Sequence, residues 1–132
     1  MLRFSPDQLH DPVLRDRRLL LEDVLQHLVD HLPGVVAAYP RDYFIATVNQ
    51  GIDLALDHEM DDVHSVRLFV RLRWEIAPGW YKEPSLAAVL SEKDRPAAER
   101  LDDLMQDRFG DAWLAAHEFN APEEWREPEA GA

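Results

Sequence analysis

The sequence contains no cysteine, and this absence excludes several kinds of chemistry at once. A disulfide scaffold, a nucleophilic thiol and a cysteine-based zinc site all require that residue. Glycine is also scarce, and its five copies are isolated from one another, so there is neither a Walker loop nor a dinucleotide-binding fingerprint. No serine lies in a Gly-x-Ser-x-Gly elbow. We therefore expect a protein that is not an enzyme and that binds no cofactor.

Long apolar runs and an excess of basic residues are absent too. No run approaches the roughly 20 apolar residues of a membrane span, and the opening residues Met1 to Asp7 lack the apolar stretch of a signal peptide. The formal net charge is −12, which repels phosphate backbones and anionic lipid surfaces. We expect a cytoplasmic protein that binds neither nucleic acid nor membranes. The acidic field either serves solubility alone or suits a basic protein partner, because opposite potentials steer encounter.

The residues that are present follow helical periodicities. Apolar residues make up 46% of the 132 residues and charged residues 30%, which is typical of one globular domain. The clearest pattern is a stripe of leucines at helical spacing, formed by Leu14, Leu21, Leu25, Leu28 and Leu32. It predicts a long helix from near Pro12 to the Pro33-Gly34 pair, followed by a connector over 35–40.

Further helices begin at aspartate, serine or proline, and two of them end at Pro78-Gly79 and at Gly110. The predicted ranges are 42–58, 61–76, 85–90, 96–110 and a final turn or two from Asp111. Gly51 lies inside the second helix at a cost of about 1 kcal/mol relative to alanine, which indicates close helix packing there. No segment has a convincing period of two. The predicted fold is all-α, a compact single-domain bundle of about five to six helices over 1–119, followed by a loose acidic tail over 120–132.

Metal binding is the sharpest chemical alternative. Asp23, His27 and His31 are four residues apart, which places three candidate ligands on one face of the long helix. This is also the polar face opposite the leucine stripe, where solvated side chains are expected. A second cluster resembles a metal site in composition alone, because helix capping explains its acids: His58, Glu59, Asp61, Asp62 and His64. We expect no bound metal.

Large aromatic side chains gather at Trp74, Trp80 and Tyr81. Tryptophan and tyrosine are favoured anchors of protein interfaces and equally good lids on a core. Trp74 belongs to the inner stripe of its helix, whereas Trp80 and Tyr81 lie on a loop where both interpretations stay open. Arg67 and Arg71, one turn apart on the preceding helix, could grip an acidic partner, although such arginines more often pair within their own chain. Our hypothesis is a protein-binding patch formed by Trp80, Tyr81, Arg67 and Arg71.

A series of short segments carries a family resemblance. They are Leu2-Arg3-Phe4-Ser5-Pro6-Asp7-Gln8-Leu9, His31-Leu32-Pro33, Val48-Asn49-Gln50-Gly51-Ile52-Asp53-Leu54-Ala55, His58-Glu59-Met60-Asp61-Asp62, Phe69-Val70-Arg71-Leu72, Pro78-Gly79-Trp80, Pro84 and Glu99-Arg100-Leu101. In this order, over residues 1–105, the chain resembles small helical accessory proteins encoded in bacterial type VI secretion gene clusters. Met60 and Trp80 depart from the residues common in that family at their positions.

The resemblance implies an accessory role beside a secreted toxin and supplies no catalytic residues. The expected function is therefore a non-catalytic adaptor or chaperone for a secreted bacterial effector or its spike-tip carrier. One alternative is an immunity protein, whose acidic residues and Trp80-Tyr81 would plug the active site of a cognate toxin. Another is a metal-dependent enzyme that uses Asp23, His27 and His31. A homodimer through an exposed apolar helix face also stays open.

Overall fold

A computed structural model describes residues 15–125, and within this range the chain forms seven α-helices and no strand. The α-helices are α3 (Arg17–His31), α4 (Pro33–Ala38), α5 (Arg41–Asp57), α6 (Val63–Glu75), α7 (Pro84–Leu90), α8 (Ala97–Leu104) and α9 (Gly110–Ala116). Three short 3-10 segments are η1 (Trp80–Lys82), η2 (Asp107–Phe109) and η3 (Pro122–Trp125). The all-α prediction is confirmed, and the described helices outnumber the predicted five to six.

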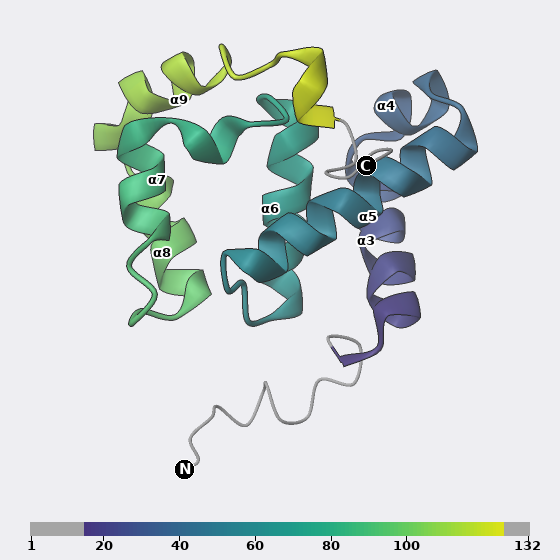
Figure 1. The fold of residues 1–132 in the computed structure, drawn as a ribbon, viewed down its shortest axis with the longest axis horizontal. Helices are drawn as coiled ribbons and strands as arrows, with labels where there is room; N and C mark the ends of the chain where they lie inside the picture. Colours follow the sequence, from purple (N-terminus) through teal and green to yellow (C-terminus); the bar gives the residue numbers. More distant parts are fainter. Residues whose placement is uncertain (1–14, 126–132) are drawn as a thin grey trace.

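The helices form two groups on either side of α6 (Figure 1). In one group, α3 packs against α4, α5 and α6, and α5 also packs along α6. In the other group, α7 packs against α8, α9 and η1, and α8 also contacts α6. One cluster of buried apolar side chains runs through both groups; its largest fully buried members are Trp80, Phe69, Leu20, Leu28, Ile52, Met60, Leu86, Leu90 and Leu104. No helix among the described residues is long and apolar enough to cross a membrane.

The long first helix is shorter than predicted, because Asp16 starts it. Its backbone is extended, with φ −117° and ψ 110°, and its carboxylate accepts hydrogen bonds from the amides of Arg18 and Leu19 at 3.0 and 3.3 Å. This is an N-cap, so a continuous helix from near Pro12 does not form. Residues 1–14, including the rest of that predicted helix, lie outside the described residues.

The leucine stripe is only partly the buried face of α3. Leu20, Val24 and Leu28 are buried, while Leu21, Leu25 and Leu32 are half-buried against the core and Leu14 lies outside the described residues. The predicted connector over 35–40 also differs, since most of it belongs to α4. Pro33 is the first residue of α4, where a missing amide proton costs no helical hydrogen bond.

Two predicted features of α5 and α6 are confirmed. Asp62 caps α6, with its carboxylate accepting from the amide of Ser65 at 2.8 Å. A Cβ added at Gly51 would lie 3.3 Å from Nη1 of Arg73 and 3.4 Å from the methyl groups of Val70. Gly51 therefore allows the close approach of α5 and α6 that the sequence indicated.

The C-terminal half is divided differently from the prediction. α7 matches the predicted helix over 85–90, but the helix predicted over 96–110 ends at Leu104. The indole nitrogen of Trp113 donates to the carbonyl of Leu104 at 2.7 Å, which satisfies a terminal carbonyl that a longer helix would use. Gly110 consequently begins α9 instead of ending the preceding helix.

Part of the predicted loose tail is packed against the body. In η3, the ring of Trp125 packs against that of Trp74 at a tilt, with the ring centroids 4.4 Å apart, and the backbone carbonyl of Glu124 accepts from Nη2 of Arg73 at 2.6 Å. Lys82 donates to both carboxylate oxygens of Glu124 at 2.8 and 3.0 Å, which raises the pKa of the lysine. The segment 122–125 is thus docked, and the remainder of the predicted tail, 126–132, lies outside the described residues.

Candidate functional site

The residues that the sequence singled out fall into two separate places. Asp23, His27 and His31 on α3 meet Arg67 and Arg71 on α6, and we call this set, with Glu75, the polar seam. The structure therefore joins the candidate metal ligands to the two candidate binding arginines. Trp80 and Tyr81 lie instead in the core, so the four residues of the hypothetical binding patch are not one surface.

A bidentate ion pair between Arg67 and Asp23 joins the two helices of the polar seam. Nε and Nη2 of Arg67 donate to the two carboxylate oxygens of Asp23, both at 2.7 Å. This fork geometry is the strong form of an arginine–carboxylate contact. It shows that Arg67 pairs within its own chain, as such arginines more often do, and that both oxygens of the first candidate metal ligand are already engaged.

His27 lies between the two arginines and the second histidine. Nη1 of Arg71 donates to Nε2 of His27 at 3.2 Å, so that nitrogen carries no proton. The pKa of His27 is lowered to about 4, mainly by burial and then by the nearby His31, Arg71 and Arg67, against the opposing effect of Asp23. The imidazole is therefore neutral near pH 7 and acts as an acceptor.

The seam does not have the arrangement of a metal centre. The rings of His27 and His31 lie 4.1 Å apart, and Nδ1 of His31 bonds to the backbone carbonyl of His27 at 2.9 Å. A cation at this position would compete with two guanidinium groups for the same acceptors. Among residues 15–125, no three histidine or acidic side chains are grouped so that they could hold a metal ion.

The second candidate cluster serves the turn between α5 and α6. Nδ1 of His58 bonds to the carbonyl of Leu54 at 2.9 Å, Glu59 pairs with Lys93 at 3.7 Å, and Asp62 caps α6. Glu59 has a φ of 59°, the left-handed conformation that lets the chain turn sharply here. Helix capping and turn formation thus account for His58, Glu59 and Asp62 of this cluster.

The aromatic pair on η1 closes the core. Trp80 is 0% exposed and Tyr81 8% exposed, and the indole of Trp80 donates to the carbonyl of Phe69 at 3.3 Å. The ring of Trp80 stacks on Trp113 at 5.3 Å, and burial raises the pKa of Tyr81. In this conformation neither ring faces a partner, so their burial favours the lid interpretation that the sequence left open.

Sequence reasoning missed a buried cation that joins the two halves. Arg100 is 1% exposed, and it donates only to backbone carbonyls: those of Arg95 at 3.1 Å, His58 at 3.0 Å, Leu90 at 2.7 Å and Glu59 at 2.9 Å. These bonds tie the α5–α6 turn to α7 and α8. An arginine on an amphipathic helix is ordinarily exposed, so the sequence carries no signal for this role.

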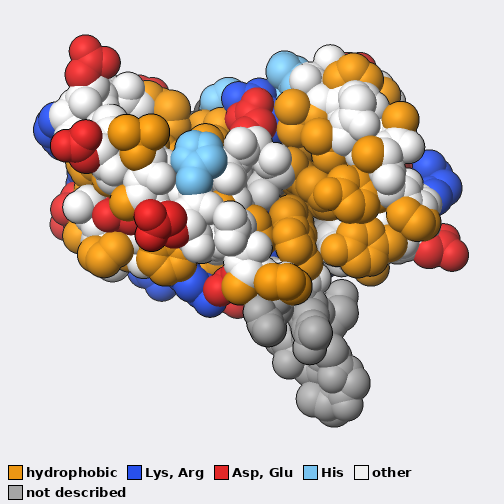
Figure 2. All heavy atoms as spheres, turned by 90° about the horizontal axis from the view of Figure 1, so that it is seen from above, with side chains coloured by type: hydrophobic (Ala, Val, Ile, Leu, Met, Phe, Trp, Pro, Cys, Tyr) orange, Lys and Arg blue, Asp and Glu red, His pale blue; other side chains and the backbone are white. Residues whose placement is uncertain are grey.

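An apolar surface on α3, α4 and α5 was also missed. Val29, Tyr39 and Tyr43 are each 42% exposed, and Figure 2 shows hydrophobic side chains gathered on the right of the view, the side that α4 and the start of α5 occupy. Val29 also lines a hollow of about 300 Å³ between α3, α4 and α5, whose other lining residues are Glu22, Leu25, Gln26, Val36, Arg41 and Phe44. We call the hollow together with Tyr39 and Tyr43 the α3–α4–α5 surface. Its signal in the sequence was the apolar composition of the supposed connector over 35–40.

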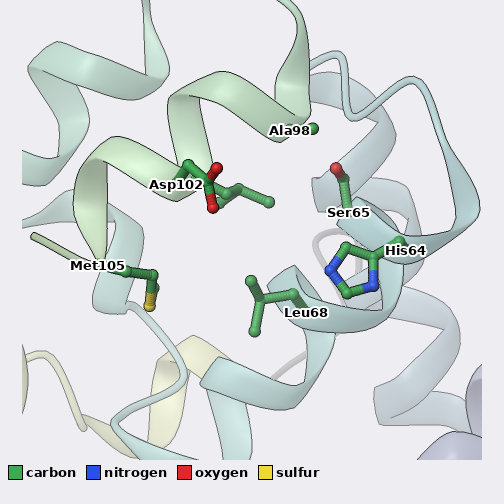
Figure 3. Close-up of a pocket in the computed structure, with 7 residues that line it drawn as sticks. His64, Ser65, Leu68, Ala98, Asp102 and Met105 are labelled. Carbon is green, nitrogen blue, oxygen red and sulfur yellow. The ribbon is translucent and has the colours of Figure 1, made fainter.

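A smaller hollow of about 250 Å³ lies between α6 and α8 (Figure 3). It is lined by His64, Ser65, Leu68, Ala98, Leu101, Asp102 and Met105. Figure 3 places the Asp102 carboxylate on α8 across the hollow from the His64 ring on α6. His64 belonged to the second candidate metal cluster, but the structure points it toward α8.

Comparisons of the chain with protein-family models, with curated proteins and with solved structures find no match. The resemblance to type VI secretion accessory proteins therefore rests on the quoted sequence segments alone.

Proposed function

We propose that this protein is a non-catalytic protein-binding factor whose partner docks on the α3–α4–α5 surface. The supporting observation is that Val29, which is 42% exposed, lines a hollow together with Leu25, Val36 and Phe44. Tyr39 and Tyr43, at the end of α4 and the start of α5, are each 42% exposed as well. Exposed apolar side chains that gather on a folded protein mark interaction sites, and tyrosine is a favoured interface anchor. This assignment moves the binding surface away from Trp80 and Tyr81, which are buried.

The shape of the surface suits a helix of the partner. The α3 residues that line the hollow are Glu22, Leu25, Gln26 and Val29, at the spacing of one helical face, and α4 and α5 form the other wall. An amphipathic helix laid between them would bury its apolar face against Leu25 and Val29. Glu22 and Arg41 on the lining would then fix its register through charge.

Within this class, the resemblance supports an adaptor or chaperone for a secreted bacterial effector or its spike-tip carrier. The net charge of −12 gives some support to the alternative of an immunity protein, because an acidic surface complements the basic active site of a toxin that acts on nucleic acid. The metal-dependent enzyme alternative has less support, since Asp23 and His27 already accept hydrogen bonds from Arg67 and Arg71.

Affinity capture with matched variants tests the proposal. The double variant Val29→Asp, Tyr43→Asp places charges on the surface, while Leu114→Asp changes an apolar side chain that is 71% exposed elsewhere, on α9. We expect the wild type and the Leu114 variant to retain the same partner from a lysate of the source organism, and the double variant to lose it. Retention by the double variant, with its helical content intact, would refute the proposed surface.

Two further measurements separate the roles. Light scattering coupled to gel filtration would reveal a second copy as the occupant of the surface. If the captured partner is a toxin, inhibition of its activity by the pure protein would favour the immunity role over the adaptor role.

A further inference from the structure

The hollow between α6 and α8 combines an apolar floor with one carboxylate. Leu68 and Leu101 form part of its lining, and Met105 is 49% exposed at its edge. The other polar members of the lining are His64 and Ser65, and the hydroxyl of Ser65 is already committed to Asp62 at 2.8 Å. The lining contains no lysine or arginine.

Asp102 differs from the acids around it because its carboxylate has no hydrogen bond or ion pair with another described residue. The adjacent Asp103 pairs with Arg95 at 2.8 Å and with Arg108 at 3.9 Å, and Arg95 also contacts Glu99 at 3.7 Å. The cations of this part of the surface are thus taken up beside the hollow. Asp102 remains as an exposed anion next to apolar side chains.

We infer that this hollow binds an arginine side chain of a partner protein. Arginine carries a long aliphatic stem that packs on apolar surface and a charged head that stays at its rim. The stem would lie on Leu68, Leu101 and Met105, and the guanidinium would pair with Asp102 through its fork of donors. The His64 ring on the opposite wall is a second planar group that the guanidinium would contact.

The charge of the whole chain agrees with this ligand. At −12 the protein attracts basic segments and repels acidic ones, and the hollow places a carboxylate where such a segment would arrive. The hollow belongs to the α6–α8 side of the molecule, whereas the α3–α4–α5 surface lies on the other side of α6 (Figure 1). The inference therefore does not depend on the proposed function, and either can fail without the other.

Small probes test the hollow directly. The protein would be labelled at its Leu, Val and Met methyl groups and titrated with n-butylguanidinium, with its neutral analogue n-butylurea and with n-butylammonium, and the NMR shifts followed. We expect saturable shifts confined to Leu68, Leu101 and Met105, with n-butylguanidinium binding more tightly than both other compounds.

Variants identify the carboxylate. Asp102→Asn should weaken n-butylguanidinium binding at least about fivefold, the equivalent of about 1 kcal/mol for a lost ion pair. Asp111→Asn, an exposed aspartate on α9 outside the lining, is the matched control and should bind as the wild type does. Equal affinity for n-butylurea, unchanged binding by the Asp102 variant, tighter binding of n-butylammonium, or the absence of localised shifts would each overturn the arginine assignment.

Discussion

Replacing Arg100 by methionine would remove four hydrogen bonds to backbone carbonyls while keeping most of the buried aliphatic stem. The guanidinium joins the α5–α6 turn, at His58 and Glu59, to the end of α7 at Leu90. The substitution therefore tests whether the two groups of helices depend on this one side chain.

Two effects oppose each other in the expected change. A buried carbonyl that loses its donor costs about 1–3 kcal/mol, but methionine also removes the several kcal/mol that burial of a positive charge costs. The bond to Leu90 is buried, whereas the bonds to the other three carbonyls are part-buried, so losing those three should cost less. We expect the free energy of unfolding to fall by about 2–4 kcal/mol.

Urea denaturation followed by circular dichroism measures the change. A loss of this size lowers the midpoint by about 1–2 M for a protein of this length. Arg108→Met is the control, because that side chain is 65% exposed and its loss should change stability by no more than about 0.5 kcal/mol. If the two variants unfold at the same urea concentration, the four carbonyl bonds make no net contribution and the reasoning fails.

Three further predictions concern the polar seam and η3. The lowered pKa of His27, about 4 in the folded protein against 6.5 when unfolded, means that the unfolded chain takes up a proton first as the pH falls, so stability should decline below pH 6.5. Between pH 7.5 and 5.5, the free energy of unfolding of His27→Gln should fall by about 1 kcal/mol less than that of the wild type, with solvent screening allowed for. An unchanged pH dependence would contradict this. A double-mutant cycle on Asp23→Asn and Arg67→Met should give a coupling energy of about 1 kcal/mol in urea unfolding, and additivity would show that the pair is inert. Trp125→Ala should cost about 1–2 kcal/mol because its ring packs against that of Trp74, whereas an unchanged melting temperature would mean that η3 does not stabilise the fold.

Helix starts were predictable where the capping group is local. Asp62 caps an amide three residues ahead, so the sequence contains both partners and the start of α6 was placed correctly. The end of α8 was not, because the group that takes up the carbonyl of Leu104 is the indole of Trp113, nine residues further on and beyond a turn. The docking of 122–125 within the predicted tail was missed for the same reason, since Trp125 contacts Trp74 far back in the chain. The periodicity of apolar residues predicts one helix at a time and carries no information on contacts between distant segments.

The polar seam shows the same division between local and distant information. Spacing correctly placed Asp23 and His27 on one face of a helix, and it placed Arg67 and Arg71 on one face of another. It could not show that the two faces meet, because the pairing residues are 44 positions apart. Each half was therefore considered for an outside ligand, a metal for Asp23 and the histidines and a partner for the arginines, whereas in the structure Asp23 and His27 bind the arginines.

The aromatic loop illustrates why composition cannot separate an anchor from a lid. Both roles need a large ring with one polar atom, and only the partner of that atom differs. For Trp80 the partner is the carbonyl of Phe69 inside the chain, which directs the ring inward. Tyr39 and Tyr43 have the opposite arrangement, with rings stacked on each other at 5.8 Å and each 42% exposed. Large apolar residues in a segment with no predicted core role are therefore a better sequence signal for an exposed apolar surface than aromatic composition alone.

The two hollows would contribute differently to the binding of one partner. The α3–α4–α5 surface offers apolar area, which provides affinity but little discrimination among apolar helices. The α6–α8 hollow offers a single carboxylate, which provides little affinity alone but rejects a partner that lacks a cation at the matching distance. Because the surfaces flank α6, one partner reaches both only if it wraps around the molecule, and two partners bind independently otherwise. Capture by Asp102→Asn distinguishes these cases: a wrapping partner is bound more weakly, and an independent one is bound as before.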